Sequence, residues 1–376
     1  MKRFILLAIL LFLLIFVSVP VYGAGTEPED YDLSQIEAYL EQEMGAESSS
    51  FGDMLDRVLE GDFSGALSQM GILAKQAAFS ELASNKNAVR QAILIALFGS
   101  LLTYFAGAFS ENSVGETGFY VSYLLLAALL FSAFGASLSI CTRVLQVLLS
   151  FLSLLVPVFF MAVAYAGGTI TSLGFYELTL LAIGGVQWLF LTFLVPIIEI
   201  YVTLLLVNSL SREDFLSKLT DLMKVVVDWG TKSLLGLIIG LNLVQGLVLP
   251  LVDSVKSSAV RKAVSAIPWI GNGADAVGQV LLGSGALIKN GIGTAALIFL
   301  VILCLMPLLK LGVITLMYQG AAAIVQPAAD KRIVACISAV ASGTKMLLKL
   351  VLYTLILFMV TVAIVCAASN ANYYAG

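Results

Sequence analysis

The sequence contains no histidine and only four cysteines among its 376 residues. Without histidine, the chain has no Ser-His or Cys-His catalytic pair, no histidine-ligated metal and no histidine pH switch. Cys141, Cys304, Cys336 and Cys366 lie in or beside apolar segments without paired spacing, which is typical of small buried thiols rather than disulfides or a metal site. We also find no Walker-type phosphate loop, no acidic cation cluster and no nucleophile beside a base. We therefore expect no enzyme activity, no catalytic residue, no metal and no cofactor.

Charged residues are scarce as well. They make up 12% of the chain, against 60% hydrophobic residues, and the mean hydropathy is +1.01. These values lie outside the range of soluble globular proteins, and several apolar runs are long enough to cross a bilayer. Because a span must satisfy its own backbone hydrogen bonds, continuous apolar runs of this kind predict helices. The predicted fold class is all-α, a polytopic helical membrane protein with membrane lipid as a partner and no nucleic acid.

The N-terminal part of the chain has the pattern of an exported segment. Lys2 and Arg3 precede an apolar run, and small residues follow up to Ala24, which predicts a secretory signal peptide over residues 1–24. An uncleaved first span is the alternative, and both send the next segment across the membrane. Residues 25–90 hold thirteen of the 24 acidic residues, in short amphipathic patterns. We expect this acidic segment to be extracytoplasmic, either as a docking surface or as a solvated lead-in.

Residues 91–376 form the predicted membrane domain, with about 6 to 8 spans. The run 178–210 is too long for one straight span, so it is either one tilted, kinked helix or a pair of half-helices. The positive-inside rule does not choose the topology after residue 178. The predicted elements are spans at 91–109, 119–140, 144–166, 231–251, 294–317 and 346–368, a tight hairpin at 142–143, amphipathic helices at 211–227 and 252–267, and a glycine-rich re-entrant or interfacial segment at 271–293.

One stretch of the chain occurs twice in altered form. Pro196 is followed by Glu199 and, 34 residues after the proline, by a Gly-Thr-Lys triplet; Pro307 is followed by Lys310 and, after 36 residues, by a second Gly-Thr-Lys. The likeness is either chance or an internal repeat of two related membrane units facing one another, each with a proline-weakened helix. Together with Pro157, the two prolines are the predicted helix break points.

Glu199 and Lys310 are the candidate site residues, because an unpaired charge inside an apolar run costs a few kcal/mol and such residues normally face the protein interior or water. Three roles stay open for them: a structural ion pair across the repeat, the lining of a polar path, and snorkelling to the interface without pairing.

An ordered set of short motifs in the second half of the chain resembles the stage III sporulation protein AE family. The likeness extends to the overall plan of signal peptide, acidic exported segment and multi-span body. The motifs are Ile267-Pro268-Trp269-Ile270-Gly271, Ala274-Asp275-Ala276, Leu287-Ile288-Lys289-Asn290, Pro307 with Lys310, and the run from Ala321 to Pro327.

The resemblance implies a subunit of the channel apparatus between the mother cell and the engulfed forespore. It implies a place in the mother-cell membrane, partners that include a cytosolic ATPase and ring-forming intermembrane proteins, and a contribution to late forespore gene expression. No catalytic residue carries over from the family. The residues also allow a homo-oligomer, and two other functions stay open: a stand-alone secondary transporter and a membrane scaffold for partner proteins.

Overall fold

The computed structural model describes residues 33–44, 64–108, 112–166, 169–211, 215–265 and 271–374, and the predicted signal peptide lies outside them. The described residues form helices and no strand, which confirms the all-α class. The helices are α2 (Ser34–Met44), α4 (Ser64–Ala108), α5 (Asn112–Tyr165), α6 (Thr169–Val186), the π-helix η2 (Gln187–Leu194), α7 (Val195–Asn208), α8 (Ser217–Ser265), α9 (Gly271–Val325) and α10 (Lys331–Tyr374).

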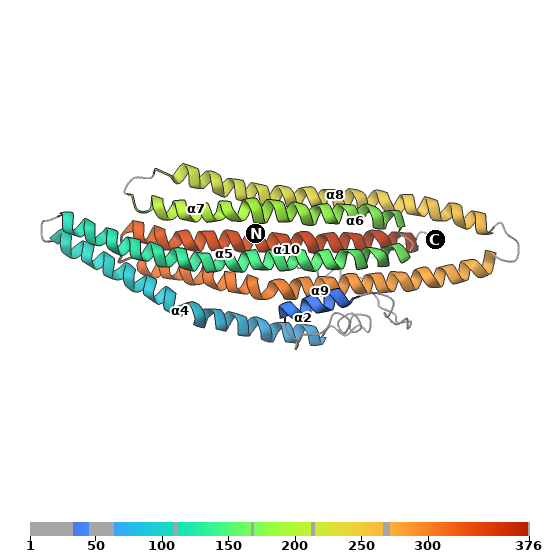
Figure 1. Cartoon of the computed structure of the whole chain (residues 1–376), viewed down its shortest axis with the longest axis horizontal. Coiled ribbons are helices and arrows are strands. Elements are labelled where there is room, and N and C mark those ends of the chain that lie inside the picture. Colours follow the sequence, from blue (N-terminus) through green and yellow to red (C-terminus); the bar gives the residue numbers. More distant parts are fainter. Residues whose placement is uncertain are drawn as a thin grey trace.

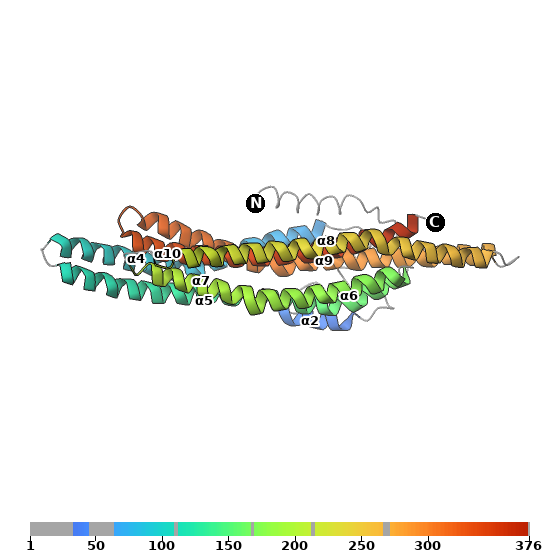
Figure 2. The ribbon, with the colours of Figure 1, turned by 90° about the horizontal axis from the view of Figure 1, so that it is seen from above.

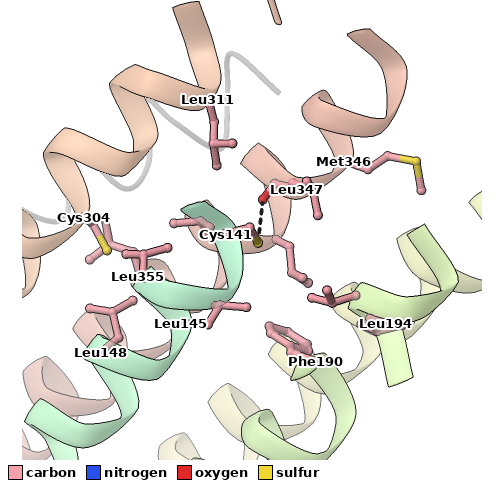
Figure 3. Close-up of a cluster of buried hydrophobic side chains, with 14 of the residues drawn as sticks. Cys141, Leu145, Leu148, Phe190, Leu194, Cys304, Leu311, Met346, Leu347 and Leu355 are labelled. Carbon is pink, nitrogen blue, oxygen red and sulfur yellow. Dashed lines mark hydrogen bonds between the residues drawn. The ribbon is translucent and has the colours of Figure 1, made fainter. Parts of the chain in front are cut away.

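The long helices run antiparallel to their neighbours in the sequence and form an elongated bundle (Figure 1; Figure 2). Helix α10 lies in its centre, packed against α5, α7, α8 and α9. Figure 3 shows how Cys141 and Leu148 of α5, Cys304 of α9 and Leu347 of α10 meet in the buried core. The core is therefore a continuous apolar seam along the central helices.

Five helices of the described chain are long and apolar enough to cross a membrane, which confirms a polytopic helical membrane protein. Helix α8 differs from the others, because only 18% of the apolar stretch that could cross the membrane is buried in the protein. The corresponding share is 39 to 56% in the other four. Its outward face carries large apolar side chains such as Leu243, Leu247 and Val248. The five segments are Thr117–Tyr165, Thr171–Asn208, Ser217–Asp253, Gly285–Val325 and Lys331–Ala368.

The predicted hairpin at residues 142–143 is wrong, because α5 runs through it without a break. Cys141 and Val144 are both buried, whereas Arg143 is exposed, so the helical pattern of inward and outward residues continues across this point. Neither glycine nor proline interrupts it there. At about 1.5 Å per residue, the 54 residues of α5 extend over about 80 Å.

The predicted division of residues 211–267 into three elements is also wrong, since α8 is continuous from Ser217 to Ser265. Gly230 does not end the helix. It lies against Leu194, and the hydroxyl of Thr231 donates a hydrogen bond to the Val227 carbonyl at 2.6 Å within the same helix. The two amphipathic patterns are therefore the ends of one long helix whose middle is apolar.

The glycine-rich stretch 271–293 is the start of the continuous helix α9, so the re-entrant segment is wrong, and an interfacial position for this stretch stays a prediction. Two of its glycines allow close packing: a Cβ at Gly285 would lie 3.1 Å from the Cα of Ala166, and a Cβ at Gly293 would overlap the Cys366 sulfur. Glycine at these positions lets α9 approach α5 and α10 closely, as in other membrane helix pairs.

The three prolines that were predicted helix break points differ in their position within the helices. Pro157 and Pro307 lie inside α5 and α9, which stay helical on both sides. Pro196 stands in the first turn of α7, directly after η2, where the Val195 amide donates to the Phe190 carbonyl five residues back. Because proline lacks an amide donor, a wider π-turn before it is a physically reasonable way to keep the chain helical. The run 178–210 is thus one helical path with a π-helical insertion.

Both copies of the repeated stretch form helical hairpins, α7–α8 and α9–α10. The two turns lie at the same end of the bundle, on the left in Figure 1, so the two hairpins run in the same direction. They contact each other, because α10 packs against both α7 and α8. The Gly-Thr-Lys triplets lie at similar distances from the two turns. In each, the threonine (Thr231, Thr344) is buried and the lysine (Lys232, Lys345) is exposed.

We predict that Gly343→Ala lowers the free energy of unfolding by about 1–3 kcal/mol, because a Cβ there would overlap Val202 of α7 and the Phe134 ring of α5. Thermal unfolding in detergent measures the change. Gly312→Ala on α9 is the matched control, since a Cβ there meets no atom within 4 Å. Equal stability of the two variants would contradict the close contact.

Candidate functional site: a polar face on a membrane bundle

Helix α5 carries a line of polar side chains on its outward surface. They recur every three or four residues, or every seventh, so they occupy one helical face. Hydrocarbon does not solvate such groups, and a polar face on a membrane helix normally faces water or another protein. We call this set the polar face of α5; its members are the exposed residues Ser132, Ser139, Arg143, Gln146, Ser150 and Ser153.

Helix α2 lies beside this face. Ile36 and Leu40 are buried and attach α2 to the bundle, and the Tyr39 hydroxyl donates a hydrogen bond to the Val147 carbonyl of α5 at 3.2 Å. The outward residues of α2, such as Glu41 and Gln42, are exposed. Helix α2 therefore extends the polar surface of α5 instead of covering it with apolar side chains.

An open groove of about 670 Å³ follows the junction of α2 and α5. The described residues that line it include one cation, Arg143, and no carboxylate. Hydroxyl and amide groups supply most of the other polar atoms, and Leu138 and Val147 form apolar patches. The groove accommodates water and small polar or anionic groups, and its described lining residues include no pair suited to acid–base or nucleophilic chemistry. Its polar lining residues are Tyr39, Ser139, Thr142, Arg143, Gln146 and Ser150.

Glu199 and Lys310 lie on different sides of the central helix. Glu199 is on α7 and Lys310 on α9, both half-buried, and α10 lies between these two helices (Figure 1). The ion pairs found between described side chains do not include this pair. A path-lining role for either residue stays a prediction.

The structure does contain an ion pair between two repeat units, but with other residues. The Lys349 ammonium group of α10 lies 3.3 Å from the Asp228 carboxylate of α8, and each side chain is about one-third exposed or less. Asp228 lies two residues before the first Gly-Thr-Lys triplet, and Lys349 lies four residues after the lysine of the second. The spacing of the two residues relative to the triplets is the sequence signal for this pair, whereas the prolines point to Glu199 and Lys310.

Lys289 is a second charged residue whose position in the fold the sequence pattern did not indicate. It belongs to one of the family-like motifs, and its side chain is completely buried in α9. Nearby, Gly293 packs against Cys366 of α10 and Phe159 of α5. The glycines around Lys289 favour a re-entrant or interfacial segment in the sequence, although glycines one turn to either side, Gly285 and Gly293, also fit a tightly packed helix.

Polar contacts of other kinds hold α8 to the bundle. Asp253 of α8 accepts hydrogen bonds from the Thr171 amide at 2.8 Å and the Thr171 hydroxyl at 2.6 Å, and so satisfies a free donor in the first turn of α6. The Asn242 amide of α8 donates to the Thr361 hydroxyl of α10 at 3.2 Å. These buried bonds fix the position of a helix that has little apolar contact.

Comparison with known proteins gives a consistent result. The family model described as stage III sporulation protein AE matches residues 49–369, a range that contains α4 to α9 and most of α10. Stage III sporulation protein AE of Bacillus subtilis (strain 168) is 21% identical over 293 residues, which cover 78% of this chain and 73% of the relative. No solved structure matches the chain.

We predict that Asp228→Asn and Lys349→Gln each destabilise the protein and that a double-mutant cycle gives a coupling of about 1 kcal/mol, as expected for a partly exposed pair. The measurement is thermal unfolding of the two single variants and the double variant in detergent. Lys345→Gln is the matched control, because Lys345 is an exposed lysine one turn away on the same helix. Strict additivity of the two substitutions would contradict the ion pair.

Proposed function

Since the chain belongs to the stage III sporulation protein AE family and is a sporulation-related membrane protein, we propose that it is a subunit of the channel or secretion complex linking mother cell and forespore. In this proposal it resides in the mother-cell membrane and contributes to late forespore development by assembly and not by catalysis. Its partners are other proteins of the same complex, including a cytosolic ATPase and ring-forming proteins between the membranes.

The observation that carries this proposal is the polar face of α5. A stand-alone bundle surrounded by lipid gains nothing from exposing Arg143, Gln146 and Ser150 on an apolar helix, because each group loses its hydration there. In a complex, the same face lines a water-filled path or contacts another subunit. The acidic helix α2 beside it has the composition of an exported segment and adds further polar surface.

The proposal also accounts for the shape of the groove. The groove is open to the outside, and the described residues around it do not enclose a cavity on their own. A secondary transporter normally binds its substrate within the bundle near the bilayer midplane. The position of the groove on the outside of the bundle therefore favours a role in which neighbouring subunits complete the path.

We predict that single cysteines at Ser150 and Ser153 react with a membrane-impermeant maleimide in sporulating cells, on a background in which the four native cysteines are replaced. Deleting the genes of the partner proteins should change the labelling rate, because the neighbouring subunits that enclose the path are then absent. Leu148→Cys is the control for the opposite side of the same helix, since Leu148 is fully buried.

Protection of both serine positions, in the assembled complex and in its absence, would contradict the path-lining role. The scaffold function would then be favoured. Labelling that is independent of the partner proteins would instead favour a protein that acts alone. In either case, expression of the variants is checked by immunoblot so that loss of folding is not read as protection.

A further inference from the structure

A small internal cavity lies between α5, α6 and α10. Most of the described residues that line it are apolar side chains of α5 and α10. The two polar ones are Thr179 of α6 and Thr361 of α10, which are 5% and 2% exposed. The centre of a water-sized sphere fits in the cavity over about 10 Å³, which is close to the room that one water molecule needs.

The hydroxyl of Thr179 distinguishes this cavity from an ordinary packing defect. A buried threonine in a helix usually donates its hydroxyl proton to a carbonyl one turn back in the same helix. Thr354 and Thr361 of α10 do so, with the carbonyls of Leu350 and Leu357 at 2.9 Å. The buried Thr179 oxygen has no hydrogen-bond partner within the part of the chain that the structure describes. A buried hydroxyl without a partner is unfavourable, so this group calls for one from outside the chain.

Thr361 offers the second polar contact at the cavity. Its hydroxyl proton is donated to the Leu357 carbonyl, and its oxygen accepts a hydrogen bond from the Asn242 amide of α8 at 3.2 Å. A hydroxyl oxygen has two lone pairs, so the Thr361 oxygen can accept one more hydrogen bond. The cavity therefore brings together one hydroxyl that lacks any partner and one oxygen with a lone pair to spare.

This pair of groups identifies the chemical class of the ligand. Water makes two to four hydrogen bonds at such sites, and the two threonines supply the minimum. A metal cation such as Ca²⁺ or Mg²⁺ requires more oxygen ligands than these two side chains provide. An apolar molecule leaves the Thr179 hydroxyl unsatisfied, and so does an empty cavity, in an interior where that arrangement is costly. Water is the ligand that satisfies both groups.

The position of the cavity connects three helices of the bundle. Helix α6 packs against α8 but only slightly against α10. Helix α8 has little apolar contact with the protein, and the fully buried Asn242 is one of the side chains that attach it to α10. A bridge from Thr179 to Thr361 would therefore continue this attachment from α8 through α10 to α6.

We propose that the cavity binds one ordered water molecule, which accepts a hydrogen bond from the Thr179 hydroxyl and donates one to the Thr361 oxygen. A chain of hydrogen bonds then runs from α6 through the water to α10 and on to Asn242 of α8. The water takes part in holding the thinly packed α8 to the bundle. The inference does not depend on the proposed function, since it concerns the isolated chain.

Radiolytic footprinting of the full-length protein in phospholipid nanodiscs tests the proposal. A short X-ray pulse turns water into hydroxyl radicals, also where the water is buried, and the radicals oxidise the side chains next to it. Phe159 and Phe160 line the cavity and are each 3% exposed. We expect mass spectrometry to show several-fold faster oxidation of these two rings than of Phe151 and Phe299. Those two are equally buried phenylalanines that do not line the cavity.

Thr179→Val and Thr179→Ser are the matched pair of variants. Valine has the shape of threonine without the hydroxyl, so the water loses a partner, and oxidation of Phe159 and Phe160 should fall to the rate of the two control rings. Serine keeps the hydroxyl and should keep the faster oxidation. Equal oxidation of all four rings in the natural protein would overturn the proposal, and so would faster oxidation that persists in Thr179→Val.

Thermal unfolding of the same variants gives a second, independent readout. With the water bridge present, Thr179→Val breaks a hydrogen bond and should lower the Tm relative to Thr179→Ser. In a dry cavity the valine would remove an unsatisfied hydroxyl, and the Tm would rise or stay unchanged. A Tm of Thr179→Val equal to or above that of the natural protein would therefore contradict the bound water. Circular dichroism checks that both variants retain their helices.

Discussion

The thickness of the hydrocarbon core is the constraint on which the other features of this structure depend. About 20 residues of helix cross it, yet the helices here have 44 to 55 residues in α4, α5, α8, α9 and α10. Each long helix must therefore pass from lipid into water or into contact with protein.

Close packing inside the bundle has a different physical basis. Apolar side chains gain little by leaving lipid for protein, so the helices associate through tight contacts and a few buried polar bonds. Gly285 and Gly293 allow α9 to approach its neighbours, and Asp253 and Asn242 connect the thinly packed α8 to α6 and α10. Glycine and polar residues thus do what a hydrophobic core does in water.

The polar face of α5 is the exception to the apolar exterior, and it lies next to the acidic helix α2. Placed at bilayer depth, such a face is unfavourable in lipid and favourable beside water or a polar partner. In the proposed complex, contact of this face with water or a polar partner replaces its unfavourable contact with lipid. In the proposed complex, helix α2 lies beside the same face, because Ile36 and Leu40 hold it against α5.

The sequence by itself determined the membrane class, the helical fold and the family, because composition, long apolar runs and ordered short motifs are local properties. It did not determine where the helices end. Pro157, Gly230 and the glycines before Thr294 all looked like interruptions, and the helices continue through every one of them. A glycine can break a helix or allow a neighbouring helix to pack closely against it. Which of the two occurs depends on the residues around it, and only the tertiary structure decided this. The same holds for charge. Glu199 and Lys310 stood out in the sequence, whereas Asp228 pairs with Lys349 because α8 and α10, which are distant in the sequence, pack together in the fold.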